Sequence, residues 1–390
     1  MDDSLISQYL RTRVLANHAG KNQLVNTIRR TMELLSDEAD RHSEQPQDKY
    51  IDELCTVAVV QKGGYAVLID LRTECGPAEH QPHEDTQHLL TAAAYTGKIE
   101  LLRALLEKNA DVNTGSRYFG KPLQAAAYAG HNDVVLLLLE QGADVDDGGA
   151  AGWYTLDQAL ASLCYGTALQ AASLAGHEHI ARLLVKSEYN AKNSGKDYPH
   201  AIMMAAQGGH PGLVQFLMEN GRITQPSRLR KLLLRRACHY GQEQVVRMML
   251  DSGANVNVHD GMTGTPLHIA AHHGYEKVVR LLLARGANQH HRHRHHPYNG
   301  PIHEAAKTGH ERVAQILLDH GADINGGWPA PLAAAAFNGK AHMVRFLLDR
   351  GADVTAPNCG DIALSEAASQ GYESVVRLLV ESGVNVEGSH

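Results

Sequence analysis

Glycine recurs between apolar segments at a nearly constant spacing along most of this chain. We call the recurring residues the marker glycines; they are Gly97, Gly130, Gly176, Gly209, Gly241, Gly274, Gly309, Gly339 and Gly371. Successive members are 30 to 35 residues apart, except for one interval of 46 residues. Such self-similarity is typical of repeat architectures. The chain has 390 residues, and stacked repeats lengthen a protein without enlarging a single core. The spacing therefore predicts a solenoid.

The clearest unit runs from Thr265 to Asn288. It reads Thr-Pro-Leu-His-Ile-Ala-Ala, then Gly274, then Val-Val-Arg-Leu-Leu-Leu, and it closes with Gly-Ala-Asn. Proline suits the first turn of a helix, where an amide hydrogen has no partner, and glycine readily ends a helix in a left-handed conformation. The Val and Leu residues give a second helix an apolar face that only a stacked neighbour can bury. Two short helices are expected in each unit.

This unit closely resembles the ankyrin repeat. Related units at 122–144, 301–323 and 331–353 extend the resemblance to about three quarters of the chain. It implies an all-α fold, an ankyrin-repeat solenoid of helix-turn-helix units with finger loops, over residues 85–390. It also implies local hydrogen bonding beside a threonine for two histidines, His268 and His303. A structural role is expected for the histidines that follow marker glycines, which are His131, His177, His210 and His310.

Residues 1–84 do not show the repeat clearly. Apolar residues at helical spacing predict two amphipathic helices near 5–14 and 24–35, so we expect a small, mainly helical region that caps the solenoid. Residues 50–84 leave two alternatives open. The Lys-Gly-Gly at 62–64 suits a hairpin, whereas Gly64 lies 33 residues before Gly97, as a degenerate repeat requires.

Charge and cysteine content narrow the class of protein. A net charge of −7 and a pI near 6.4 argue against a nucleic-acid partner. The five cysteines are widely spaced and form no CxxC pair, which favours a reducing compartment, the cytoplasm or the nucleus. The N-terminus lacks the pattern of a secretory signal, and no apolar run approaches the roughly 20 residues of a membrane span. We expect no membrane association.

In the ankyrin fold, the inner helices and finger loops line one concave surface that binds partners. The residues just before each marker glycine are expected to face it, and the loops add aromatic residues of the kind that dominate binding hot spots. The candidate binding residues are Tyr95, Tyr118, Phe119, Tyr128, Trp153, Tyr154, Leu174, His239, Tyr240, His272, His273 and Trp328. The long interval places 13 additional residues around 147–165. They form either an enlarged functional finger or a tolerated insertion.

Two local sequences depart from the pattern. The fifth unit opens with Arg228-Leu229-Arg230-Lys231 and continues with Arg235-Arg236; this basic segment engages an acidic partner or a phosphate, or it is a solvated helix face. The run from His290 to His296 contains imidazoles that can bind zinc, copper or nickel, although its arginines would repel a cation. A pH-responsive basic loop is the competing interpretation. We expect neither a resident metal nor a cofactor.

The sequence contains no GxGxxG, P-loop, GxSxG or HExxH motif. The leading hypothesis is therefore a non-enzymatic scaffold that binds another protein through a concave aromatic surface. The alternative is a small-molecule-binding or catalytic solenoid, in which the 147–165 loop closes over a Tyr/His-lined groove. Acid–base groups would then come from Asp260, Glu304 and Asp361.

Overall fold

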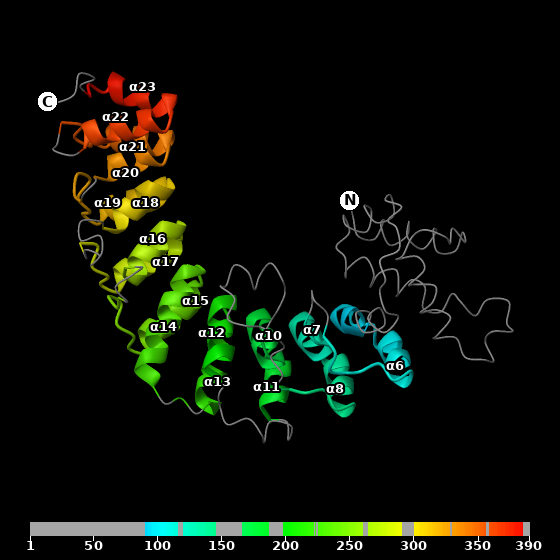
Figure 1. Ribbon diagram of the computed structural model, residues 1–390. Coiled ribbons are helices and arrows are strands. Elements are labelled where there is room, and N and C mark those ends of the chain that lie inside the picture. The colour runs from blue at the N-terminus through cyan, green and yellow to red at the C-terminus, as the bar shows by residue number, and fades with distance from the viewer. Residues whose placement is uncertain are drawn as a thin grey trace, which may run out of the picture. The chain divides into compact units, whose positions relative to one another are not determined.

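The computed structural model describes residues 90–115, 120–145, 166–186, 198–221, 223, 225–259, 264–290, 300–327, 330–355 and 359–384. The chain divides into two compact units, residues 1–205 and 206–390, which we treat separately. The regular elements of the described ranges are α-helices, in agreement with the expected all-α repeat fold (Figure 1). The predicted capping region and the 147–165 finger lie outside the described residues, as do residues 291–296 of the histidine-rich loop.

The first unit is built from helix pairs that meet at marker glycines. Residues 90–96 are helical and precede α6 (Ile99–Glu107). The next pairs are α7 (Pro122–Ala129) with α8 (Asn132–Glu140), and α10 (Ala168–Ala175) with α11 (Glu178–Lys186). We call the first helix of a pair the inner helix and the second the outer helix. Inner helix α7 packs against α10, and outer helix α8 contacts α11.

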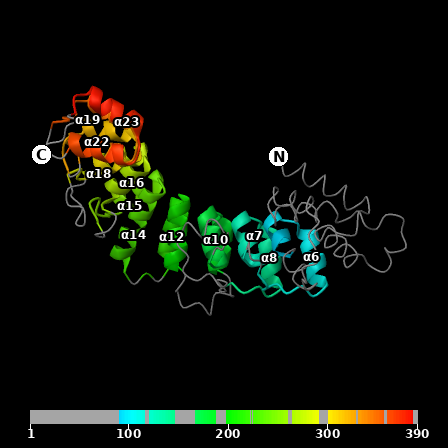
Figure 2. The same cartoon turned by 45° about the horizontal axis from the view of Figure 1, so that its top comes forward.

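The second unit continues the same plan. The division between the units falls within α12 (Tyr198–Gly208), which is followed by α13 (Pro211–Asn220). Each inner helix from α14 to α22 packs against the next inner helix, as the ribbon and its turned view show (Figures 1 and 2). The pairs are α14 (Pro226–His239) with α15 (Glu243–Asp251), α16 (Pro266–His273) with α17 (Glu276–Ala284), α18 (Pro301–Thr308) with α19 (Glu311–Asp319), α20 (Pro331–Phe337) with α21 (Ala341–Asp349), and α22 (Gly360–Ser369) with α23 (Glu373–Glu381).

The α16–α17 pair shows why the repeat sequence folds in this way. Thr265 caps α16, and its hydroxyl lies 2.8 Å from Nδ1 of His268, as the resemblance implied. Gly274 ends the helix with φ of +76°, where a residue with a side chain would be strained. The apolar face of the pair is buried between neighbours, through Leu267, Ala270, Ala271, Val278, Val279, Leu281 and Leu282.

The implied threonine contact is wrong for His303. The N-cap residue of α18 is Gly300, which has no hydroxyl, although the imidazole of His303 is buried like that of His268. The helix still begins at the expected proline, Pro301. The start of the helix therefore does not depend on the threonine–histidine pair.

Side chains that follow marker glycines tie each repeat to the one before it. In the first unit, Nε2 of His131 lies 3.0 Å from the carbonyl oxygen of Tyr95, and Nε2 of His177 lies 2.9 Å from that of Tyr128. In the second unit, Gln242 donates to the carbonyl of Gln207 at 2.8 Å. These contacts confirm the structural role expected for His131 and His177.

Asparagines in the turns add a second link between repeats. The side chain of Asn257 accepts a hydrogen bond from the backbone N–H of Asn288 at 2.7 Å and donates to the carbonyl of Gly286 at 3.4 Å. Asn113 makes the equivalent contact to the N–H of Asp144 in the first unit. Neighbouring turns are thus held in a fixed register by hydrogen bonds between asparagine side chains and backbone groups.

Helix α14 is longer than its repeat position requires. It begins at Pro226, 15 residues before Gly241, whereas α16 begins at Pro266, eight residues before Gly274. The basic segment of the fifth unit therefore begins on helical turns that α16 lacks. No helix within the described ranges is both long and apolar enough to cross a bilayer.

Candidate functional site

The last residues of the inner helices in the second unit form an exposed polar and aromatic surface. Helix α14 ends at His239 and is followed by Tyr240, while α16 ends with His272 and His273. These side chains are exposed or half-buried, whereas the alanines one turn earlier in α16 are fully buried. The structure thus separates the packing positions of each inner helix from its surface positions.

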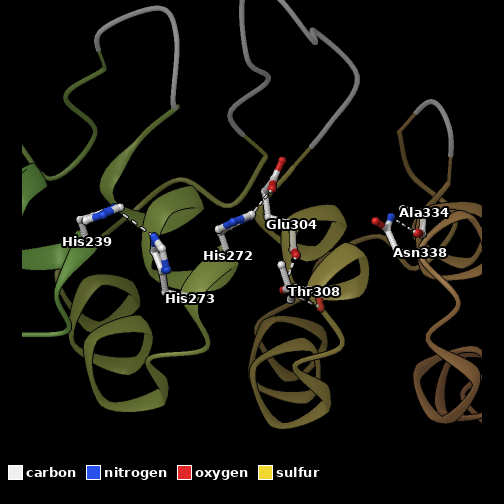
Figure 3. A network of polar contacts seen from close by, with 8 residues as sticks. His239, His272, His273, Glu304, Thr308, Ala334 and Asn338 are labelled. Carbon is white, nitrogen blue, oxygen red and sulfur yellow. Dashed lines mark hydrogen bonds and ion pairs between the residues drawn. The ribbon is translucent and has the colours of Figure 1, made fainter. Parts of the chain in front are cut away.

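Two histidines from consecutive repeats contact each other directly. Nε2 of His273 lies 3.0 Å from Nδ1 of His239, and the two rings are nearly perpendicular, with centroids 4.4 Å apart (Figure 3). When both imidazoles are neutral, one ring nitrogen donates and the other accepts. Tyr240 packs edge-on against His239, and Tyr275 stacks on His273. The rings therefore support one another's orientation.

A third inner helix joins through a carboxylate. Glu304, in the first turn of α18, lies with Oε2 3.0 Å from Nδ1 of His272 (Figure 3). The hydroxyl of Thr308 donates to the backbone carbonyl of Glu304 at 2.8 Å. We call the residues His239, Tyr240, His272, His273 and Glu304 the imidazole cluster. Its contacts run across three consecutive inner helices, α14, α16 and α18.

The charge state of the imidazole cluster follows from its surroundings. Burial lowers the pKa of His273 to about 4, with further contributions from His239, His272 and His310. Burial alone would raise the pKa of Glu304, but the hydrogen bond to His272, together with His303 and Lys307 nearby, holds that pKa below its ordinary value. At neutral pH, His273 is thus neutral and Glu304 is ionised.

The low pKa of His273 should be measurable by NMR. We expect its imidazole to titrate near pH 4, and we expect its pKa to rise in a His239→Asn variant, because one of the charges that disfavours protonation is removed. Since folding lowers this pKa from 6.5, the stability contributed by neutral His273 should be complete above pH 6.5 and decline as the pH falls toward about 4. A His273 midpoint near pH 6.5 in the folded protein would contradict this account.

The first unit carries a separate aromatic pair. The rings of Tyr95 and Tyr128 are stacked, with centroids 6.5 Å apart and planes inclined by 16°. Burial, and then the neighbouring Tyr128, raise the pKa of Tyr95. Leu174 is half-buried at the equivalent position of α10, in the next repeat. The shared offset from the marker glycines thus brings the two predicted tyrosines into contact.

Five of the predicted binding residues lie outside the described residues, namely Tyr118, Phe119, Trp153, Tyr154 and Trp328. Two residues at this surface were not among the predicted binding residues: Glu304, a member of the imidazole cluster, and its neighbour Arg236. Glu304 was considered only as an acid–base group, and Arg236, which hydrogen-bonds Gln207 at 3.2 Å and also Tyr240, was considered only as part of the basic segment. Both lie five residues before a marker glycine. The expectation that the residues just before each marker glycine face the surface therefore did not select them.

The described residues give little support for a metal site or a reactive thiol. Within those ranges, no three His, Cys, Asp or Glu side chains are grouped so that they could hold a metal ion. Burial raises the pKa of the Cys238 thiol far above its ordinary range. Burial, and then the charge of Asp353, raise the pKa of Cys359 to about 11. Neither thiol is a ready thiolate ligand or nucleophile at neutral pH.

Comparison with known proteins agrees with this geometry. A family model described as ankyrin repeats (3 copies) matches residues 57–148, 169–260, 202–293, 233–327 and 302–389. The chain belongs to the ankyrin-repeat family, whose repeats are generally protein-interaction modules. No curated protein matches the sequence. The first match begins at residue 57, and the division into a capping region and a repeat domain remains a prediction.

Proposed function

We propose that this protein is a non-enzymatic recognition scaffold that binds another protein through the surface of its inner helices. The observation that carries the proposal is the imidazole cluster, whose exposed or half-buried side chains touch one another across α14, α16 and α18 instead of packing into the core. The Tyr95–Tyr128 stack supports the same use of the inner helices in the first unit.

The physical argument is preorganisation. Side chains that already contact each other lose less conformational freedom when a partner binds. Tyrosine and histidine also combine an apolar ring with polar atoms, so they contact apolar and polar groups of a partner at once. Because α16 has neither lysine, arginine nor carboxylates, Glu304 on α18 is the only carboxylate of the imidazole cluster that must be desolvated on binding. Both features favour the binding of a protein partner at this surface.

The acid–base alternative gains no support from the His272–Glu304 pair. Their side chains are 42% and 23% exposed, so the pair faces solvent. The lowered pKa of Glu304 also makes this carboxylate a weaker base than an ordinary glutamate. A catalytic reaction would need a site that excludes water and a carboxylate whose pKa lies nearer to neutrality.

Quantitative affinity capture from isotope-labelled lysates tests the proposal. The cluster variant combines His239→Ala, Tyr240→Ala and His273→Ala; the control combines Lys277→Ala, Arg280→Ala and Arg345→Ala, which are exposed on outer helices. We expect the cluster variant to lose partners by about tenfold or more while the control retains them. Equal losses from the cluster variant and the control, with unchanged circular dichroism, would show that partners do not bind through the imidazole cluster.

Once a protein partner has been identified, the contribution of the Tyr95–Tyr128 stack to its binding can be tested separately. Truncation of Tyr128 to alanine should cost about 2 kcal/mol of binding, roughly thirtyfold in affinity, if the tyrosine stack is a hot spot. Glu373→Ala, at an exposed position on α23, serves as the distal control. Isothermal titration calorimetry gives both affinities, and equal values would exclude the tyrosine stack from the interface.

A further inference from the structure

Helix α14 carries a concentration of positive charge that the other described inner helices lack. Pro226–His239 contains Arg228, Arg230, Lys231, Arg235 and Arg236 and has no aspartate or glutamate. The inner helices α7, α10, α16 and α20 contain no lysine, arginine, aspartate or glutamate. This contrast occurs in a chain whose net charge is −7. The cationic helix is therefore a local feature and not a consequence of overall composition.

Two of the four arginines on this helix, Arg235 and Arg236, have structural partners. Arg235 is only 9% exposed, and its Nη1 donates to the carbonyl of Gly264 at 2.6 Å, which holds the turn before α16. Arg236 donates to Oε1 of Gln207 at 3.2 Å. Both guanidinium groups are thus used within the second unit, and we do not assign them to a ligand.

The other three cations lie on the additional turns by which α14 exceeds α16. Arg228 is exposed, while Arg230 and Lys231 are half-buried. Lys231 donates to the backbone carbonyl of His259 at 2.6 Å, a neutral acceptor that leaves its charge uncompensated. Within the described ranges, none of the ion pairs includes Arg228, Arg230 or Lys231. Their positive field is therefore directed at solvent.

An aliphatic side chain completes this surface. Leu232 is 42% exposed, whereas Leu229, Leu233 and Leu234 of the same helix are buried. Residues three and four apart are neighbours on a helix, so Arg228, Lys231 and Leu232 share one face. Arg230 lies off that face and adds to the positive field around it. We call these four residues the α14 basic face.

We propose that the α14 basic face docks an acidic peptide segment that also presents an aliphatic side chain. Charge complementarity selects the acidic segment, since the three cations have no carboxylate partner among the described residues and attract an anionic chain. The exposed leucine selects a peptide over a nucleic acid, because an aliphatic contact adds nothing to phosphate binding. This inference names a second surface and does not rest on the imidazole cluster.

Fluorescence anisotropy with the full chain tests this inference. The probe is a fluorescein-labelled peptide of about a dozen residues built from Glu-Asp-Leu-Glu units, and a Gln-Asn-Leu-Gln peptide is its uncharged counterpart. We expect the acidic probe to bind, more weakly as salt rises from about 50 to about 150 mM, and the uncharged peptide not to bind. An Arg228→Gln, Arg230→Gln, Lys231→Gln variant should weaken binding by about tenfold or more.

The matched control removes the same amount of charge from outer helices, with Lys277→Gln, Arg280→Gln and Arg345→Gln, and should bind the probe within about twofold of the parent. Leu232→Ser should weaken binding by roughly threefold without changing the salt dependence. Equal weakening by the two triple variants would show that binding depends on net charge and not on the α14 basic face, and it would overturn the proposal. So would tighter binding of an oligothymidine of similar length, which would identify a nucleic-acid surface.

The imidazole-cluster variant separates this inference from the proposed function. His239→Ala, Tyr240→Ala and His273→Ala together should leave probe binding within about twofold of the parent, because none of these residues belongs to the α14 basic face. Failure of the probe to bind the parent would overturn this proposal and leave the capture experiment unaffected. Circular dichroism of each variant checks that α14 is retained.

Discussion

Replacing Leu282 with aspartate is expected to destabilise the second unit by more than about 4 kcal/mol, because it buries a charge without a partner in addition to removing apolar contacts. Leu282 is 0% exposed on α17, which packs against α15, α16 and α19. Since repeats are stabilised mainly by their neighbours, the loss should spread to adjacent helix pairs. Urea unfolding followed by far-UV circular dichroism measures the effect.

Leu136→Asp is the matched control for this change. Leu136 is 41% exposed on α8, so the same substitution there should cost less than about 1 kcal/mol. If Leu282→Asp unfolded at the same urea concentration as the parent, the assignment of buried positions on the outer helices would be wrong. The inner-surface assignment depends on the same spacing and would then also need revision.

Gly274→Ala is expected to cost roughly 2–3 kcal/mol, as the sum of two effects. The residue has φ of +76°, and a Cβ added there would lie 2.6 Å from Nδ1 of His310 in the following repeat. Gly286→Ala tests the backbone effect alone, because φ is +80° and the added Cβ meets no described atom within 4 Å. We expect only about 1 kcal/mol at that position.

A double-mutant cycle isolates the contact between the two repeats. Combining Gly274→Ala with His310→Ala should cost less than the sum of the single changes, because the truncated side chain leaves room for the new methyl group. Additive costs within about 0.3 kcal/mol would show that His310 does not press on Gly274 in solution. Thermal or urea unfolding of the four proteins gives the comparison.

Much of the repeat fold follows from local sequence. Pro266 and Gly274 mark the two ends of α16, and the structure places the helix between them. The Val-Val-Arg-Leu-Leu-Leu run predicts the buried face of α17, since apolar residues at helical spacing need a neighbour to cover them. These features are determined within one repeat, and so they can be read without knowing the rest of the fold.

The candidate site was less accessible to sequence reasoning. Equal offsets from marker glycines correctly indicated that Tyr95 and Tyr128 lie on adjacent inner helices, where they stack. The same offsets did not indicate that Glu304 pairs with His272, because that contact joins the start of one helix to the end of another. Side-chain rotamers and the spacing between helices decide such contacts, and both depend on packing.

The sequence by itself determined the repeat period, the helix pairs and the positions that must be buried, because each is encoded by residues within a few helical turns. Only the tertiary structure decided that Glu304 pairs with His272 and that His273 remains neutral beside His239. These properties depend on groups brought together from repeats about 30 residues apart. Burial and electrostatic interactions at such contacts exist only once the repeats are stacked.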